Sequence, residues 1–403
     1  MKNGYLLKFG ALSVVIAGII PSNYACAALD KFDPYAYVLA NYDSNVFRLA
    51  GDQEAIAVIG DENRDDLIMH YGAGLSADLK LSRQHLVADV LVERADYDEF
   101  DELNHTMVDS RVGWQWQVGN LWSGTLGYRY QDQLSSFNEQ LVPQKDMRTT
   151  NTYSLSAGYQ LHPDWKLVAG ADYKDASYEE RKRLDREKTS ALFEIQYKNT
   201  LNTTVGIRGR FSENKLGDVL VLGAPASGDY NETEISGVIY WQGSGKSALE
   251  ARLGYTDLSY DELNQRDFQG TTGRLTYFWE ISGKTQINVA AWQETSSLSD
   301  EVRDYVLSTG FSLAPTWSIT RKVRLIGNVS FVNDDFKAEN DLSGSLGTPK
   351  REDDTWLYSI GIRWTPIQNL QTLLLYQYED RDSTINNRDF TDEQVRAKLQ
   401  YTF

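Results

Sequence analysis

Apolar and polar residues alternate with a period of two along most of the chain. Between Leu67 and Leu81 every odd position is apolar or aromatic, whereas the even positions include His70, Asp78 and Lys80. Successive side chains of a β-strand point to opposite faces, so this pattern predicts a strand with one apolar and one polar face. The stretch is much longer than the usual strand of about 5–6 residues.

The same alternation recurs to the end of the chain and predicts 18 strands. In order they are Tyr35–Tyr42, Leu67–Leu81, Leu86–Val92, Val108–Val118, Trp122–Tyr130, Tyr153–Leu161, Trp165–Tyr173, Thr189–Tyr197, Leu201–Phe211, Ile235–Trp241, Leu249–Tyr255, Thr271–Trp279, Thr285–Ala291, Tyr305–Leu313, Val323–Phe331, Trp356–Trp364, Leu370–Tyr378 and Val395–Phe403. Strand boundaries read from sequence carry an error of a few residues, and 16 strands is the alternative count.

The connections between these strands alternate in length. Short turns lie at 119–120, 162–164, 198–200 and 282–284, and longer polar segments at 50–66, 134–147, 213–229 and 334–353. No proline falls at a strand centre, as a continuous ladder requires. The pattern predicts an all-β fold, a transmembrane antiparallel up-and-down β-barrel with short periplasmic turns and long extracellular loops. None of the long loops has a feature that marks it as a constriction loop.

Average composition does not distinguish a soluble from a membrane protein here. The distinction appears only when the two faces of each predicted strand, formed by alternate residues, are considered separately. The mean hydropathy of -0.47 and the absence of a long apolar run argue against membrane-spanning helices. The net charge of -17 argues against a nucleic-acid partner. Apolar faces that are as long as these must instead contact lipid, which leaves the polar faces to line a lumen.

The N-terminal segment has the features of a signal peptide. Lys2 and Lys8 precede the apolar run from Phe9 to Ile20, and small residues follow at Ala25 and Ala27. We expect residues 1–27 to be removed by cleavage near Ala27 and residues 28–403 to form a single barrel domain in the cell outer membrane of a Gram-negative bacterium. The mature chain would contain no cysteine, so disulfides would not stabilise it.

Aromatic residues support a membrane-spanning barrel. Trp356 and Trp364 share one face of a predicted strand, as do Trp165 and Tyr173. Eight residues of strand span roughly 26 Å, or roughly 20 Å after a tilt of about 40°, which is close to the height of the apolar band of such barrels. The last strand ends in alternating apolar residues and a terminal aromatic, a pattern that resembles the signal for the barrel-assembly machinery. The residues of this signal are Val395, Leu399, Tyr401 and Phe403.

The polar faces carry many charged residues, which are the candidate lining of the lumen and of a substrate path. The residues are Arg111, Arg129, Arg208, Arg210, Arg252, Arg274, Arg324, Arg363, Arg396, Lys398, Asp109 and Glu194. One interpretation is that they form cross-strand ion pairs that brace the wall. The other is that the arginines attract anionic solutes and make the lining selective.

Catalytic and metal-binding patterns are weak. The four histidines lack the spacing of a metal motif, and neither a Cys nucleophile in the mature chain nor a Gly-x-Ser-x-Gly sequence is present. His70 with a nearby serine could imitate the catalytic cluster of an outer-membrane hydrolase. We nevertheless predict that the protein is not an enzyme and requires no cofactor or metal.

The segment NYDSNVFRL near the first strand resembles a box in the EpsL-like family, the outer-membrane β-barrel proteins of exopolysaccharide operons. The matching residues are Tyr42, Asp43, Asn45, Val46, Phe47 and Arg48. The resemblance implies a role in export or assembly of a capsular or biofilm polysaccharide. It transfers no functional residue, and the box is expected to be structural, as an inward-folded plug or rim element.

Two functions therefore remain open, with a surface adhesin or scaffold as a third. The first is a polysaccharide-export barrel, whose partners would be the polysaccharide chain and periplasmic export proteins. The alternative is a general or sugar- or anion-selective diffusion porin. In either case we expect contacts with outer-membrane lipid, lipopolysaccharide and the barrel-assembly machinery.

Overall fold

The computed structural model describes residues 32–403, apart from 139, 141–142, 222–223, 297–305 and 337–350. The predicted signal peptide, the start of the strand predicted at Tyr305 and much of the loop predicted at 334–353 lie outside the described residues. Eighteen strands form one sheet, and a separate two-stranded sheet lies in a loop. The strands of the large sheet are β1 (Phe32–Asp43), β2 (Asp66–Leu81), β3 (Gln84–Tyr97), β4 (His105–Val118), β5 (Trp122–Leu134), β6 (Met147–His162), β7 (Trp165–Tyr178), β8 (Arg186–Lys198), β9 (Thr203–Leu216), β12 (Tyr230–Ser244), β13 (Ser247–Tyr260), β14 (Phe268–Ser282), β15 (Thr285–Ser296), β16 (Val306–Ser318), β17 (Val323–Asp335), β18 (Glu352–Ile367), β19 (Leu370–Ser383) and β20 (Phe390–Thr402).

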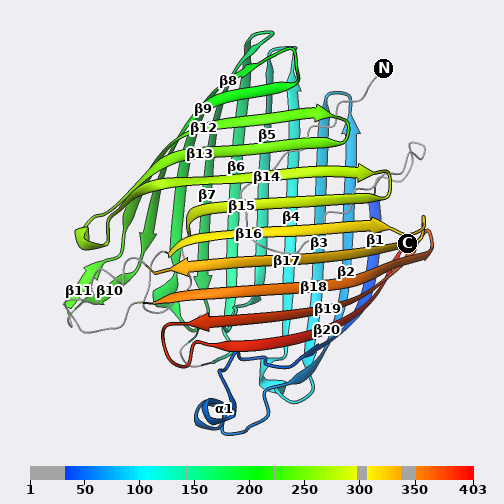
Figure 1. The fold of residues 1–403 in the computed structure, drawn as a ribbon, viewed down its shortest axis with the longest axis vertical. Helices are drawn as coiled ribbons and strands as arrows, with labels where there is room; N and C mark the ends of the chain where they lie inside the picture. Colours follow the sequence, from blue (N-terminus) through cyan, green and yellow to red (C-terminus); the bar gives the residue numbers. More distant parts are fainter. Residues whose placement is uncertain (1–31, 139, 141–142, 222–223, 297–305, 337–350) are drawn as a thin grey trace. The chain divides into compact units, whose positions relative to one another are not determined.

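The large sheet closes on itself as an antiparallel barrel. Each strand pairs with the next one along the chain, with β9 followed by β12, and the first and last strands pair through Tyr35 with Thr402 to Asp43 with Gln394. Figure 1 shows β12 to β20 side by side in chain order. Closure leaves no edge strand, so every strand has a partner for its backbone groups on both sides, as hydrocarbon surroundings require.

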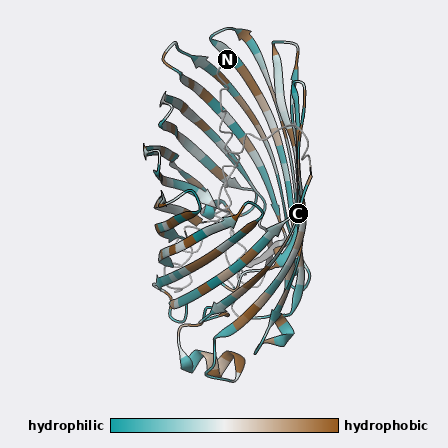
Figure 2. Cartoon of the chain, turned by 90° about the vertical axis from the view of Figure 1, so that its right-hand side faces the viewer, coloured by the Kyte–Doolittle hydropathy of each residue, from teal (hydrophilic) through white to brown (hydrophobic). Residues whose placement is uncertain are grey.

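Strand register gives the wall an outer and an inner face. Tyr37 pairs with Gly72, which pairs with Glu93, and residues of this parity carry the polar side chains. The opposite parity carries exposed apolar residues such as Leu75, Val90 and Val112. Figure 2 shows the resulting alternation of hydrophilic and hydrophobic residues along the strands. The outer face is therefore apolar and the inner face, which we call the lumen, is polar.

Aromatic pairs lie on the outer face at two levels along the strands. Trp122 contacts Tyr159 and Trp165 contacts Tyr197 near the short turns, with ring centroids 4.7 and 5.1 Å apart. Further toward the long loops, Tyr128 contacts Tyr153 at 4.8 Å near the middle of β5 and β6, and Phe331 contacts Trp356 at 4.8 Å on β17 and β18. Two such belts are typical of barrels that cross a membrane.

The long-loop end contains structure that alternation does not predict. The helix α1 (Asp52–Ile59) lies in the loop after β1, and its last turn ends at Gly60, which has φ 81°. The hairpin of β10 (Asp218–Val221) and β11 (Ala224–Ser227) lies between β9 and β12. Single 3-10 turns occur at Asp101–Leu103, Lys182–Leu184 and Asn264–Arg266. Within the described ranges, every helix is too short or too polar to cross a membrane.

The predicted fold class and the count of 18 strands are confirmed. The strands are longer than predicted, chiefly at the long-loop end, where polar residues occupy both faces. Strand β6, for example, begins at Met147, six residues before the predicted start. Beyond the apolar belt the outer face contacts water, so hydrogen bonding within the ladder continues after the alternation ends.

Candidate functional site

The strand register places all ten predicted cations on the lumenal face. Three pairs of arginines lie directly opposite one another on neighbouring strands: Arg111 and Arg129, Arg252 and Arg274, and Arg324 and Arg363. Side chains in such positions have Cβ atoms about 4.5–5.5 Å apart, and like charges there repel. Each pair therefore requires a compensating anion or water.

Four of the predicted cations form ion pairs with carboxylates of the same face. Arg129 donates two hydrogen bonds to Asp109, at 3.1 Å from Nε and 2.6 Å from Nη2. Arg208 contacts Glu194 at 2.7 Å. Arg252 contacts Glu234 at 2.6 Å, and it shares Glu294 with Arg274. The predicted residues Asp109 and Glu194 thus act as counter-ions in this lining.

The other six cations have no carboxylate partner within ion-pair distance in the described part of the chain. Arg396 donates a hydrogen bond to Asn41, and the Nζ atom of Lys398 lies 3.6 Å from the ring centroid of Tyr37. The remaining four are Arg111, Arg210, Arg324 and Arg363. The Nε atoms of Arg210 and Arg363 are buried without a hydrogen-bond partner. The register places Asp89 opposite Arg111 and Glu234 opposite Arg210. The lumen therefore combines arginines that face carboxylates with the Arg324–Arg363 pair, which has no carboxylate opposite it on the neighbouring strands.

A hydrogen-bonded cluster surrounds Tyr37 on the lumenal face of β1. The hydroxyl of Tyr37 donates to Glu93, whose other carboxylate oxygen lies 2.9 Å from Nδ1 of His70. Gly72 makes room for the Tyr37 ring, because a Cβ at this position would lie 2.3 Å from the ring. His70 is thus part of a wall contact with Glu93, and the hydrogen bond described for its ring joins it to this carboxylate and not to a serine.

The residues of the Tyr42–Arg48 box fasten the first long loop to the barrel. Arg48 contacts Asp43 and Asp392, each at 3.0 Å. Burial disfavours the charged guanidinium, but the two carboxylates outweigh this effect and raise the pKa of Arg48. Asn45 donates to the carbonyls of Leu49 and Thr391, at 2.8 and 3.0 Å. Tyr42 points to the outer face, where it is 40% exposed.

Phe47 leads from the box into an apolar cluster among the loops, which we call the rim cluster. Its buried members are Val46, Phe47, Leu49, Ala55, Leu103 and Phe137. The ring of Phe47 packs against Phe100 and Phe137, with centroids 4.7 and 5.0 Å apart. Three loops and α1 therefore share one small core, and the expectation of a structural rim element agrees with these contacts.

The described residues of the loop between β5 and β6, which are 135–138, 140 and 143–146, contact other parts of the barrel rim. The carbonyl of Asn138 accepts a hydrogen bond of 3.0 Å from Arg381, on β19. In the barrel order, β20, β1, β2, β3 and β4 separate β19 from β5. A second contact fixes the loop, because Asp146 pairs at 2.7 Å with Arg181 of the next long loop. The sequence singled out no constriction loop, and the described residues of this segment connect β5 with β19 at the long-loop end of the barrel.

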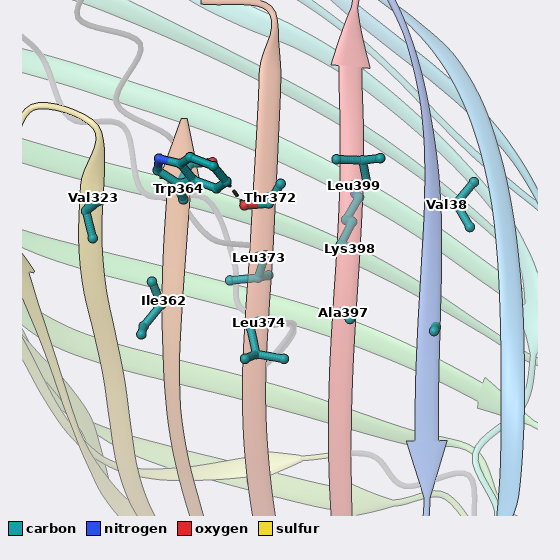
Figure 3. Close-up of a pocket in the computed structure, with 11 residues that line it drawn as sticks. Val38, Val323, Ile362, Trp364, Thr372, Leu373, Leu374, Ala397, Lys398 and Leu399 are labelled. Atoms are coloured by element: carbon teal, nitrogen blue, oxygen red, sulfur yellow. Dashed lines mark hydrogen bonds between the residues drawn. The ribbon is translucent and has the colours of Figure 1, made fainter. Parts of the chain in front are cut away.

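A polar cavity of about 360 Å³ lies on the lumenal side of this loop. Its lining includes Arg48, His70, His105 and Arg396, together with Ser135 to Asn138 of the loop. A larger groove, of about 650 Å³, is lined by Val323, Ile362, Trp364, Leu374 and Leu399 among others. Figure 3 shows these side chains along neighbouring strands. Their parity assigns this groove to the apolar outer face, so it is no candidate for a polar solute.

Metal and cofactor sites do not emerge from these contacts. Across the described ranges, no group of three or more His, Cys, Asp or Glu side chains is arranged to hold a metal ion.

The signal residues Val395, Leu399, Tyr401 and Phe403 lie exposed on the outer face, Phe403 at 70%. Their predicted recognition by the assembly machinery stays a prediction.

Comparisons with known proteins found a partial family match and several similar solved structures. Residues 244–403 match the family described as "Putative beta-barrel porin 2". No curated protein matches the sequence. Solved structures with a similar fold include the outer membrane protein OpdK from Pseudomonas aeruginosa, at 11% identity and a TM-score of 0.47, covering 93% of this chain and 99% of that chain. They also include OccK2 (OpdF) from the same organism, at 10% identity and 0.48, covering 93% and 99%. A BenF-like porin from Pseudomonas fluorescens Pf-5 has 9% identity and 0.48, covering 93% and 100%. Such low identity transfers no residue role.

The closed antiparallel barrel with an apolar outer face has the architecture of an outer-membrane β-barrel, and residues 244–403 resemble a porin family. The predicted resemblance to the EpsL-like exopolysaccharide family is wrong, because the matching family is a different one and its match lies at 244–403, away from the Tyr42–Arg48 box. The box is short, and its residues are explained by local packing at the rim. Polysaccharide export and a role in biofilm rested on that resemblance alone and lose their support.

Proposed function

We propose that the protein is a diffusion porin that passes small hydrophilic solutes through its lumen and favours anions. The observation that carries this proposal is the lumenal row of Arg324, Arg363 and Lys398, which has no carboxylate within ion-pair distance in the described residues. A barrel of 16–18 strands is wide enough for an aqueous channel. Rings of Arg or Lys side chains are the usual lining of pores that select anions.

The proposed orientation follows the rule for bacterial barrels, with the short turns in the periplasm and the long loops outside. In this orientation the loop 135–146 would narrow the lumen near its outer end, and solutes would meet Arg324, Arg363 and Lys398 near the periplasmic end. We also propose that the barrel contacts lipopolysaccharide and the assembly machinery, and that it catalyses no reaction.

Planar-bilayer recording tests the proposal. We expect stepwise conductance increases when the purified barrel is added. Under a KCl gradient, the sign of the reversal potential should show that chloride permeates better than potassium. The double substitution R324Q/R363Q should lower the ratio of anion to cation permeability. A barrel that inserts, shown by its heat-modifiable mobility on gels, and yet conducts no current would exclude the porin function. A cation-preferring channel would exclude only its proposed selectivity.

A further inference from the structure

The lumen contains three cross-strand arginine pairs, and two of them show how such a pair is neutralised. At Arg252 and Arg274 the carboxylate of Glu294 bridges both guanidinium groups, with one oxygen on Arg252 and the other 2.7 Å from Nη2 of Arg274. At Arg111 and Arg129 the carboxylate of Asp109 binds Arg129 through two hydrogen bonds. A carboxylate with two oxygens is thus the partner that this wall itself uses.

The third pair, Arg324 on β17 and Arg363 on β18, has no such carboxylate in the part of the chain that the structure describes. Its neighbours in register are Ser318 on β16 and Leu373 on β19. Two residues along the same face of β17 and β18 lie Ile326 and Gly361. None of these side chains is acidic. Nε of Arg363 is buried without a hydrogen-bond partner.

The position of the pair is suited to a solute. Arg324 is the second residue of β17, directly after the short turn at 319–322, so the pair lies near the short-turn end of the lumen. The register row continues through Leu373 to Lys398, which adds a third positive charge on β20. Figure 3 shows Val323, Ile362 and Trp364 on this part of the wall. They are the sequence neighbours of the two arginines on β17 and β18, and side chains of successive residues point to opposite faces.

We propose that Arg324 and Arg363 form a binding site for the carboxylate of a small organic anion, which takes the place that Glu294 occupies at the Arg252–Arg274 pair. Guanidinium groups bind carboxylates through paired, charge-assisted hydrogen bonds, and the buried Nε of the half-buried Arg363 is a donor without a partner in the described residues. The inference deepens the proposed porin function, for which it supplies a solute class, but the binding itself does not require an open channel.

Ligand-observed NMR on the detergent-solubilised full chain tests the site directly. Benzoate serves as the carboxylate probe, benzamide as its neutral analogue and phenyl phosphate as an anion of different geometry. We expect saturation transfer to benzoate and little to benzamide. The R324Q/R363Q variant should bind benzoate at least about tenfold more weakly, which corresponds to about 1.4 kcal/mol.

The double substitution R111Q/R129Q is the matched control, because it removes the same charge from a cross-strand arginine pair that already has Asp109 beside it. Benzoate binding should be nearly unchanged in this variant. An equal loss in both variants would indicate a general charge effect and overturn the site, as would unchanged binding in R324Q/R363Q. Saturation transfer to phenyl phosphate without transfer to benzoate would overturn the carboxylate assignment. Heat-modifiable mobility verifies that each variant is folded.

Binding and conductance separate the two proposals. A barrel that binds benzoate at Arg324 and Arg363 but conducts no current would refute the porin function and retain the site. A conducting barrel that binds no benzoate would retain the porin function and refute the site.

Discussion

At the residue scale, the most informative side chain is Asn45, which is only 1% exposed. Its amide nitrogen donates to Leu49 and Thr391, and its Oδ1 accepts a hydrogen bond of 3.0 Å from the backbone of Leu49. Thr391 belongs to the last strand and Leu49 to the first long loop. One side chain therefore joins segments near the two ends of the barrel domain. Through Asn45, the Tyr42–Arg48 box attaches the first long loop to the last strand.

The substitution N45A should release this loop. It removes three hydrogen bonds with backbone groups of Leu49 and Thr391, so we expect the free energy of local opening to fall by about 2 kcal/mol or more. Limited trypsin digestion at Arg48 and Arg64 should accelerate accordingly. N369A, at an exposed position in a short turn, is the control and should leave cleavage unchanged. Equal digestion rates for N45A and the native chain would contradict the assigned role.

At the element scale, the loop 135–146 is positioned by a buried ion pair. The side chains of Asp146 and Arg181 are 0% and 4% exposed, and Asp146 also accepts a hydrogen bond of 2.9 Å from the backbone of Glu180. Arg181 additionally donates to Ser135 at 2.8 Å. Removing one member of a buried pair leaves the other charge without compensation, which is the costly case for such pairs.

We therefore expect D146N to destabilise the closed position of this loop by about 3–5 kcal/mol. Tryptic cleavage at Lys145 should become faster, and in bilayers the single-channel conductance should rise or become noisier. D164N is a suitable control, because Asp164 forms an exposed contact with His162 at 3.6 Å, and exposed pairs contribute about 0–1 kcal/mol. If Lys145 is cut at the native rate in D146N, the pair does not hold the loop.

At the scale of the whole molecule, closure depends on the last strand. β20 pairs with both β19 and β1, and the backbone of Phe403 donates to the carbonyl of Pro34 at 2.8 Å. The Phe403 side chain itself contributes little to the folded barrel. It is 70% exposed, and its ring contacts Tyr401 with centroids 5.1 Å apart.

The modest contacts of this ring make F403A a clean test of the assembly signal. We expect a several-fold decrease in heat-modifiable barrel in the outer membrane, while the barrel that does assemble melts at nearly the native temperature. F32A is the matched control, since Phe32 is 57% exposed at the same end of the barrel and lies outside the signal. An equal yield of F403A and F32A would argue against recognition of the terminal residue.

Much of this architecture follows from the sequence because side chains of a strand alternate with a strict period. Parity alone placed Arg111, Arg252 and Arg363 on the polar face and Trp356 and Trp364 on the apolar one. The loops offered no comparable period. Their apolar residues, such as Phe47 and Phe137, are far apart in the chain and become one cluster only when the barrel brings their strands together.

The sequence by itself thus determined the strands, their two faces and the barrel, since these depend on local alternation and on the need to satisfy every backbone group in lipid. Only the tertiary structure decided which charges are compensated. Arg274 and Arg324 look equivalent in the sequence, as single arginines on the polar faces of strands. Register places Glu294 beside the first and Arg363 beside the second, because cross-strand neighbours depend on how the strands align around the closed sheet.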